Sequence, residues 1–437
     1  MIGCAEPLSK TGFVRLVLPM DGALRPLLPD VGVLALVPDP WNAVWQARHQ
    51  VLTRLARYFR VVWINPPIAW RDALRGSMIE PMSHGLIAPD GLSVYEPEAW
   101  LPELYRPSWL AALTRNARLR RARSLLIRQG CRTIILCVWR PELVRTSGGP
   151  HFQLICYHID DEYSFSGTDA PISDIERQLI AAVDQVFIGS PALMAKKGVI
   201  NTNTTFAPNG TDYAAYAAES PEPPDIASIP HPRIGYSGIV KRHLDWPMLD
   251  RLPKARPDWS FVFVGPIQDH PGTQRAAAQL SRFPNVHFLG LKTPQQLGAY
   301  PRHFDVCVMP YRVDDYTKYI YPLKLHEYLA SGRPVVTARI RSVEEFKNVL
   351  TLVDDVDHWP SAIAEALSPG ANSPERRKAR QAVARRHDWN LLVSRMARTM
   401  AARLAPQYLE RLERGLEAES IAIESTSAAS AFDIDLR

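Results

Sequence analysis

One short stretch of the chain, YPLKLHEYLASGRPVV at residues 321–336, places a lysine and a glutamate in a pattern that could bind an anion. The stretch predicts a short helix with a proline near its start and a glycine at its end, followed by a strand. Lys324 falls in the first helical turn, where the helix dipole disfavours a cation by about 0.3–1 kcal/mol. Glu327 lies three residues on and on the same face, which is the poorer order for a helix ion pair. Two interpretations are equally open. Either a phosphate lies beside Lys324 while Glu327 accepts from sugar hydroxyls, or the pair is a solvated surface face.

Basic residues and glycines also follow the predicted strands in the second half of the chain. Ligands of open α/β sheets bind beyond the carboxyl ends of the strands. Gly238 would allow a close backbone approach, and Lys241 or Arg242 could reach a phosphate. Lys292 follows a later strand, in a segment that also suits a phosphorylated ligand. The chain has neither GxGxxG nor a P-loop sequence, so a phosphorylated ligand would be held in another way.

Candidate residues in the first half of the chain come from two places. His158, Asp160 and Asp161 follow a predicted strand, and His158 or Asp161 could position or deprotonate a ligand hydroxyl. The alternative is that the aspartates cap the following loop. Trp45, Arg48 and His49 occupy the first strand-to-helix turn, where a second ligand would approach. Arg48 and His49 could equally be solvated helix residues.

The elements that must position these residues alternate between strand and helix, which indicates parallel sheets. We expect an N-terminal extension at 1–29, a first α/β domain at 30–210 and a proline-rich linker at 211–232. A second α/β domain follows at 233–372, then helices at 373–410 and a disordered tail at 411–437. The second domain is expected to contain strands at 233–238, 260–265, 285–290, 305–310, 334–338 and 350–353.

Composition restricts the class of protein. The 437 residues are 46% hydrophobic and 22% charged, as in a soluble globular protein. Five scattered cysteines without a CxxC pair argue against a disulfide framework or a structural zinc site and favour a reducing compartment. The sequence also lacks an apolar run of the roughly 18 residues that a membrane span needs. These features predict a cytoplasmic protein.

Charge is concentrated in residues 114–132, which hold seven arginines and no acidic residue in a chain of net charge +6. One interpretation is attraction to an anionic membrane surface, to which each basic residue adds about 1 kcal/mol. The other is a solvated helix face. Nucleic acid is not an expected partner, because the segment has no interleaved aromatic residues and no nucleic-acid motif.

The segment DVCVMPYRVDDYTKYIYPLKLHEYLASGRPVV (305–336) resembles the donor site of GT-B glycosyltransferases, which often read PxKxxEY followed by AxGxPVV. YHIDDEYSF, FAPNGTD and RIGYSGIV are similar to other parts of these enzymes. The segment 41–67 is similar to the opening of polysaccharide-building members, such as the teichuronic-acid type. The resemblance implies two tandem Rossmann-like, doubly wound parallel-sheet domains that face a cleft, with C-terminal helices.

The resemblance also implies that a sugar is transferred from a nucleotide-sugar to an acceptor held by the first domain. Retention of the anomeric configuration and no cofactor or bound metal are expected. Lys324 would contact the diphosphate and Glu327 the ribose, with Leu325 beside them in the donor site. Many retaining members carry two glutamates spaced E-x7-E, and the first of these positions is Tyr319 here. Two DxD-like strings, at 355–357 and 433–435, are interpreted as chance matches.

The predicted function is therefore glycosyl transfer to a glycan or lipid-linked acceptor in cell-surface polysaccharide assembly, with an anionic membrane surface as a candidate partner. Two alternatives stay open. A GT-B nucleotide-sugar epimerase would turn over its donor without an acceptor. A non-catalytic protein would bind a nucleotide-sugar or glycan without turnover, an alternative kept open by Tyr319.

Overall fold

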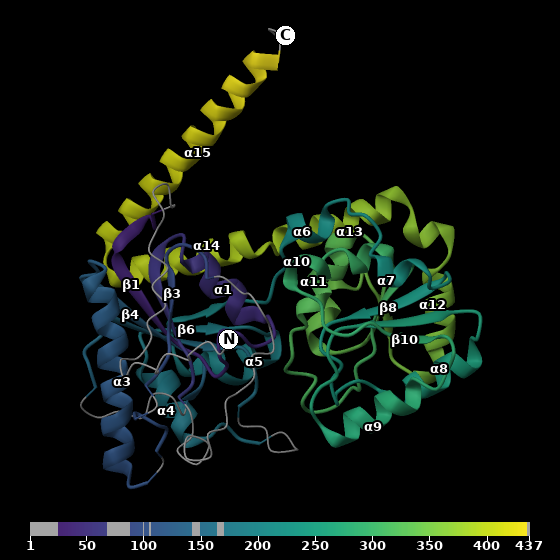
Figure 1. The fold of residues 1–437 in the computed structure, drawn as a ribbon, viewed down its shortest axis with the longest axis horizontal. Coiled ribbons are helices and arrows are strands. Elements are labelled where there is room, and N and C mark those ends of the chain that lie inside the picture. The colour runs from purple at the N-terminus through teal and green to yellow at the C-terminus, as the bar shows by residue number, and fades with distance from the viewer. Residues whose placement is uncertain are drawn as a thin grey trace, which may run out of the picture.

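The structure is a computed structural model that describes residues 25–67, 88–98, 100–104, 106–141, 149–163 and 170–434, with side chains described up to residue 421. Within these residues the chain forms two α/β lobes that lie side by side (Figure 1). Each lobe is built on one parallel sheet. The predicted architecture of two tandem parallel-sheet domains is confirmed. Most of the predicted N-terminal extension lies outside the described residues.

The N-terminal sheet has seven strands in the order β3-β2-β1-β4-β5-β6-β7, and all adjacent strands are parallel. Val33 and Leu34 belong to separate hydrophobic clusters, because successive strand residues point to opposite faces. Helices therefore cover both faces, as parallel sheets require. The strands are β1 (Leu28–Leu36), β2 (Phe59–Ile64), β3 (Leu92–Tyr95), β4 (Thr133–Val138), β5 (Leu154–Ile159), β6 (Gln185–Ile188) and β7 (Thr204–Phe206).

The C-terminal sheet has six parallel strands in the order β10-β9-β8-β11-β12-β13. Its strand order reverses between β8 and β11, as the N-terminal order reverses between β1 and β4. Ligands of doubly wound sheets bind at such switch points. The strands are β8 (Arg233–Ser237), β9 (Ser260–Val264), β10 (Val286–Phe288), β11 (Val306–Met309), β12 (Val335–Ala338) and β13 (Thr351–Val353).

Helices cover both sheets. In the N-terminal lobe, α1 and α14 pack on one face and α3, α4 and α5 on the other. In the C-terminal lobe, α11 packs against α13. The helices are α1 (Ala47–Leu55), α3 (Ser108–Arg128), α4 (Asp174–Ala182), α5 (Pro191–Lys197), α6 (Tyr213–Ala217), α7 (Pro224–Ala227), α8 (Trp246–Ala255), α9 (Pro271–Leu280), α10 (Pro294–Leu297), α11 (Leu323–Ser331), α12 (Trp359–Ala366), α13 (Pro374–Arg386), α14 (Trp389–Leu404) and α15 (Pro406–Ile434).

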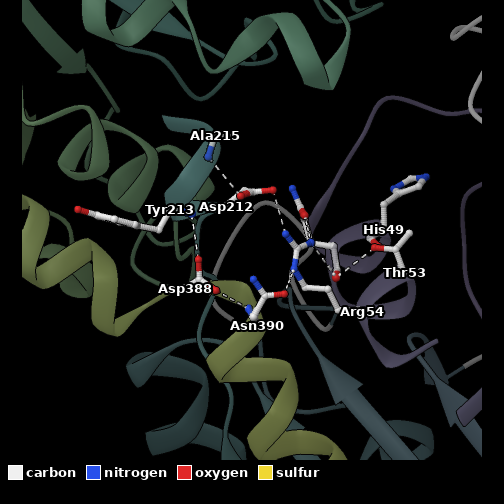
Figure 2. A network of polar contacts seen from close by, with 9 residues as sticks. His49, Thr53, Arg54, Asp212, Tyr213, Ala215, Asp388 and Asn390 are labelled. Carbon is white, nitrogen blue, oxygen red and sulfur yellow. Dashed lines mark hydrogen bonds and ion pairs between the residues drawn. The ribbon is translucent and has the colours of Figure 1, made fainter. Parts of the chain in front are cut away.

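The chain passes between the lobes twice, and the two passages are hydrogen-bonded to each other. The backbone N–H of Thr211 donates to the carbonyl of His387 at 3.0 Å, and that of Trp389 donates to the carbonyl of Thr211 at 2.9 Å. Arg54 of α1 also bonds both passages, reaching Asp212 and Asn390 at 3.1 Å each (Figure 2). The hinge is therefore a paired structure tied to the N-terminal lobe.

Two of the predicted boundaries are corrected by the packing. The expected linker at 211–232 contains α6 and α7, and its residues Tyr216 and Ile226 are buried in the core of the C-terminal lobe. The expected disordered tail begins inside α15, which extends beyond the N-terminal lobe (Figure 1). Leu412 is buried against that lobe, and Arg411 binds both carboxylate oxygens of Asp30 at 2.9 and 2.6 Å. Burial and this ion pair hold the start of the tail in place.

The helices predicted at 373–410 belong to both lobes. Arg380 of α13 donates to the carbonyl of Gly332 at the end of α11, at 3.0 Å. Helix α14 crosses back, and its residues Val393 and Ala397 are buried in the same cluster as Val33 of β1. Within the described part of the chain, no helix combines the length and the apolarity needed to cross a bilayer.

Candidate active site

Lys324 lies in the first turn of α11, and its ammonium group is surrounded by tyrosines. Its Nζ donates to the hydroxyl of Tyr311 at 3.0 Å and lies 4.8 Å from the ring centroid of Tyr236. Burial lowers the pKa of Lys324, but the hydroxyls of Tyr236, Tyr311 and Tyr328 raise it by more than burial lowers it. The pKa of Lys324 therefore lies well above its usual value. Lys324 therefore stays charged at a helix start where the dipole itself favours an anion.

Gly238 brings the backbone after β8 next to Lys324. Its φ of +119° is a conformation that side-chain-bearing residues rarely adopt. A Cβ at this position would lie 3.3 Å from Cε and 3.4 Å from Nζ of Lys324. The predicted close backbone approach at Gly238 is thus matched by its geometry, and the space above it is free only because the residue is glycine.

Replacing Gly238 with alanine is expected to lower the free energy of unfolding by about 1–3 kcal/mol, because alanine is strained at this φ. It should also displace the Lys324 side chain and weaken binding of a diphosphate. Urea unfolding and calorimetric titration with inorganic pyrophosphate measure the two effects. Gly370→Ala is the matched control, since its Cβ would meet nothing within 4 Å. Equal behaviour of the two variants would contradict this account of Gly238.

Glu327 lies one turn deeper in α11 than Lys324, and the two side chains have separate tyrosine partners. Glu327 accepts a hydrogen bond from Tyr216 of α6, while Lys324 donates to Tyr311. Burial raises the pKa of Glu327 to about 7, although Lys324 and the Tyr216 hydroxyl lower it. A carboxyl group whose pKa is raised to about 7 beside a half-buried cation is more typical of functional sites than of a solvated helix face.

The other predicted donor residues of the C-terminal lobe differ in their surroundings. Lys241 is exposed by its surface area, yet loss of hydration at its ammonium group and the charge of Lys324 lower its pKa, while Asp161 of the N-terminal lobe raises it. Arg242 is exposed and donates through Nε to His243 at 3.3 Å. Lys292 forms an ion pair with Asp225 of α7 at 2.7 Å. The structure therefore brings Lys241, but not Lys292, into the electrostatic environment of Lys324.

The acidic run after β5 supplies the N-terminal side of the site. Asp160 binds Arg48 at 3.0 Å and also accepts from Tyr163. Burial raises the pKa of Asp160, but Arg48, His158 and Tyr163 outweigh burial and hold it below its usual value. Burial and the charge of Asp160 raise the pKa of its neighbour Asp161. Two adjacent carboxyl groups whose pKa values are pushed apart are suited to different roles.

The remaining N-terminal candidates are largely enclosed. His158 is buried and stacks on Trp139 with ring centroids 5.3 Å apart, and burial lowers its pKa to about 4. His49 is fully buried, with Nδ1 accepting from the Gln46 backbone and Nε2 bonded to the Trp41 carbonyl, each at 3.1 Å. The predicted acceptor contact of His49 is thus corrected, since both of its ring nitrogens are used inside the fold. Trp45 stacks on His49 with centroids 4.9 Å apart and stays half-buried.

Neither DxD-like string forms a metal site within the described residues. Asp355 accepts from the backbone N–H of Asp357, and Asp357 pairs with Arg251 at 3.3 Å. The second string ends outside the described residues. In the part of the chain that the structure describes, no group of three or more His, Cys, Asp or Glu side chains is placed to hold a metal ion. A surface hollow lined by His231, Asp305 and Asn372 lies at the opposite, amino ends of β8 and β11.

Comparisons with known proteins agree with this arrangement. Residues 232–369 match the family described as glycosyl transferases group 1. The chain is similar to the putative teichuronic acid biosynthesis glycosyltransferase TuaH of Bacillus subtilis, with 32% identity over 191 residues, or 42% of this chain and 47% of that protein. The chain thus spans about half the length of the curated relative that it matches.

Solved structures match most of both lobes. Sucrose-phosphate synthase from Thermosynechococcus elongatus superposes with a TM-score of 0.62 at 16% identity, covering 85% of this chain and 98% of that one. Anabaena HepE in complex with UDP and glucose gives a TM-score of 0.59 at 14% identity, covering 85% and 99%. The chain has the GT-B fold. The GT-B resemblance expected from residues 305–336 is confirmed, and the group 1 match covers the lobe that carries Lys324 and Glu327.

Two of the residues predicted to contact the donor, Leu325 and Tyr319, are buried in the structure. Leu325 is fully buried in the core of the C-terminal lobe, because it lies about 100° around α11 from Lys324. Its predicted donor contact is corrected, since the side chain supports the helix from inside. Tyr319 is 4% exposed and belongs to a hydrophobic cluster of the N-terminal lobe that contains Ile188 and Leu193. The residue at the position of the first glutamate of E-x7-E thus contacts the opposite lobe.

Sequence reasoning missed the tyrosines of this GT-B site. Tyr311 and Tyr236 hold Lys324, and Tyr216 holds Glu327. Tyr316 joins the two lobes through Asp161. The signal available was the four tyrosines between residues 311 and 321. Nothing in their spacing says which of them face the partner lobe.

Proposed function

We propose that the protein is a glycosyltransferase that moves a sugar from a nucleotide-sugar donor to a glycan or lipid-linked acceptor in cell-surface polysaccharide assembly. The observation that carries this proposal is the charged Lys324 at the start of α11, close to Gly238, with Glu327 one turn deeper. The match to group 1 glycosyl transferases and the similarity to a putative teichuronic acid enzyme support it. HepE with UDP and glucose, and the E. coli trehalose-6-phosphate protein with UDP-2-fluoro glucose, support a nucleotide-sugar donor.

In the proposed reaction, the donor diphosphate binds where positive charge converges. Lys324, Lys241 and the first N–H groups of α11 would meet its oxygens, and Gly238 leaves room for them. Fixed donors aimed at a leaving group stabilise the charge that develops on it in the transition state. Glu327 would accept from the ribose hydroxyls. We propose on this basis that the protein's own cations supply the charge stabilisation and that no metal or cofactor is required.

The acceptor would approach from the N-terminal lobe, where Asp161 and the half-buried Trp45 lie. Asp161 is the better candidate to orient the acceptor hydroxyl, because the pKa of Asp161 is raised by burial and by Asp160 whereas Asp160 is held by Arg48. His158, with a pKa lowered to about 4, would act as a neutral hydrogen-bonding group. Retention of the anomeric configuration is proposed from the resemblance at 305–336.

A panel of nucleotide-sugars tests the proposal. Release of the free nucleotide is measured for each donor with and without lipid-linked acceptors, in the presence and absence of EDTA. Acceptor-dependent release that survives EDTA is the expected result. Epimerised donor without any acceptor would instead support the epimerase alternative. Donor binding without turnover under every acceptor would support the non-catalytic alternative, and an absence of donor binding would overturn the site.

The proposal also includes an anionic membrane surface as a partner, on the cytoplasmic side. The solvent face of α3 carries exposed apolar side chains, Trp109 (66%), Leu113 (58%) and Ile127 (47%). Arg120, Arg121 and Arg128 lie exposed on the same helix, which contains no acidic residue. Tryptophan and arginine on one face suit a bilayer interface.

The double variant Trp109→Ala/Leu113→Ala is expected to lose most of its binding to vesicles of phosphatidylglycerol and phosphatidylcholine, because it removes the apolar contacts at one end of α3. Vesicle co-sedimentation at two salt concentrations measures this. Leu391→Ala, which removes an apolar side chain of 48% exposure from α14, is the matched control. Equal binding of wild type to purely zwitterionic vesicles, or no binding at all, would overturn the membrane partner.

A further inference from the structure

The segment 314–321, here called the tyrosine loop, lies between β11 and α11 and is locked by its own side chains. Oδ1 of Asp314 accepts from the backbone N–H groups of Tyr316 at 3.0 Å and Thr317 at 2.8 Å. The Thr317 hydroxyl accepts from the backbone of Asp314 and donates to the carbonyl of Arg312 at 2.7 Å. Thr317 is fully buried. The loop is thus a preformed turn whose tyrosines have fixed directions.

The tyrosine loop of the C-terminal lobe contacts the N-terminal lobe through Tyr316, Tyr319 and Tyr321. The hydroxyl of Tyr316 donates to Oδ2 of Asp161 at 3.0 Å. Tyr319 is buried in the N-terminal cluster, with Nζ of Lys196 5.0 Å from its ring centroid. The carbonyl of Tyr321 accepts from the Asn209 side chain at 2.6 Å. These contacts join elements more than 100 residues apart and depend on the lobes lying close together.

Tyr316 is held rigidly on its own lobe. Its ring stacks on His243, with centroids 4.2 Å apart and an interplanar angle of 23°. Because the backbone N–H of Tyr316 is also bound by Asp314, its hydroxyl has little freedom to follow Asp161 if the lobes separate. Opening the lobes would therefore break this hydrogen bond rather than stretch the side chain.

Asp161 receives one hydrogen bond from each lobe. Its Oδ1 accepts from the backbone N–H of Glu162 at 2.8 Å, and its Oδ2 accepts from Tyr316. The neighbouring charges are Asp160 on the same run and Lys241 across the interface. Asp160 is satisfied within its own lobe by Arg48 and Tyr163, so Asp161 is the carboxylate whose orientation depends on the C-terminal lobe.

We propose that Tyr316 is a positioning residue, which fixes the carboxylate of Asp161 in its acceptor-facing orientation only when the two lobes are closed. The role given to Asp161 rests on the proposed function, whereas the closure of the two lobes does not. Tyr319 completes the arrangement by packing on the N-terminal lobe from the position where the resemblance leads one to expect a donor-contacting glutamate. The same loop leads directly into the helix start that carries Lys324. Donor binding at α11 and orientation of Asp161 are thereby coupled through one short segment.

The test compares Tyr316→Phe with Tyr95→Phe, a control that removes a Tyr–Glu98 hydrogen bond of 2.6 Å within the N-terminal lobe. Tyr316→Phe is expected to lower kcat at least tenfold while the affinity for UDP changes less than threefold. The acid limb of the pH–rate profile should move to higher pH, because the Tyr316 hydroxyl lowers the pKa of Asp161 and phenylalanine cannot. In an Asp161→Asn background the same substitution should change kcat less than twofold. An unchanged kcat and pH profile, or a loss confined to UDP affinity, would overturn the positioning role.

Small-angle scattering tests closure without reference to catalysis. Tyr316→Phe, and more strongly Tyr316→Phe/Tyr319→Ala, should shift the population toward a larger radius of gyration, and Tyr95→Phe should not. Coincident curves for wild type and the double variant would show that the loop does not hold the lobes together. If wild type turned over no nucleotide-sugar, the proposed function would fail while the scattering result still decided the closure.

Discussion

Replacing Lys324 with alanine is expected to lower kcat/KM for the nucleotide-sugar by about 10²–10³-fold, the usual consequence of removing one fixed donor from a developing negative charge. Lys324 is half-buried, bound to Tyr311 and placed at the start of α11, so its charge acts where water screens it weakly. Affinity for UDP should fall in parallel. Calorimetric titration with UDP and initial rates with the active donor of the panel measure the two losses.

A second lysine provides the control for Lys324→Ala. Lys254→Ala removes a lysine that pairs with Asp250 at 2.7 Å on the exposed face of α8, and it should leave both quantities unchanged. Lys324→Arg is also informative, because the guanidinium is larger than the ammonium group that lies beside Gly238. We expect it to recover little activity. Normal UDP affinity in Lys324→Ala would show that the diphosphate does not bind at this end of α11.

Local sequence patterns were sufficient to predict the elements that hold the site. The stretch 321–336 forms helix α11 and strand β12, and Gly332 ends the helix at a φ of +76°. Gly238 has the positive φ that a close approach needs. Such features depend on hydrophobic period, proline and glycine, all of which act over a few residues. The alternation of strands with helices predicted parallel sheets, and the two parallel sheets of the structure confirm the two-lobed architecture.

The partners of each charged group could not be predicted in the same way. Lys324 and Glu327 are three residues apart, yet Lys324 is held by Tyr311 and Glu327 by Tyr216, more than 100 residues away from it. Lys292 was predicted from its place after a strand, but it turns to Asp225 instead. A strand end gives the position of a side chain and not its direction. Direction depends on contacts that only the packed lobes create.

Tyr319 stands where the E-x7-E motif has its first glutamate, and its packing explains what this side chain does instead. From sequence, the absence of a glutamate keeps a non-catalytic alternative open. In the structure the side chain fills a gap between the lobes, beside Lys196. A buried glutamate at this point would need compensation for the loss of its hydration. Tyr319 is therefore informative about how the lobes meet, and turnover has to be decided by the donor panel.

Replacing Glu327 with glutamine is expected to stabilise the protein at pH 8 and to weaken nucleotide binding at the same time. Burial raises the pKa of Glu327 from 4.5 to about 7, so the folded protein binds more protons than the unfolded chain between these values. Stability must then fall as pH rises through this range, by roughly 1–3 kcal/mol. Glutamine cannot ionise and still accepts from Tyr216. The Tm of Glu327→Gln should exceed that of wild type by several degrees at pH 8, with the difference disappearing toward pH 4.5.

The nucleotide affinity of Glu327→Gln shows whether Glu327 contacts the ribose or the diphosphate. If the carboxylate accepts from the ribose hydroxyls, wild type should prefer UDP over 2′,3′-dideoxy-UDP by about 10–100-fold at pH 8, since hydrogen bonds to charged groups contribute about 1.5–3 kcal/mol. The preference should shrink at pH 6, where Glu327 is mostly protonated, and titration of the phosphates cancels between the two ligands. Glu327→Gln should show a small, pH-independent preference, and Glu365→Gln, an exposed site on α12, should behave as wild type.

A Tm difference that did not vary with pH would contradict the raised pKa of Glu327. An unchanged preference for the ribose would contradict only the contact between Glu327 and the ribose. Near neutral pH the ionised Glu327 carboxylate lowers the stability of the ligand-free protein, and a bound ribose would compensate for that cost by supplying the hydrogen bonds that the ionised form lacks.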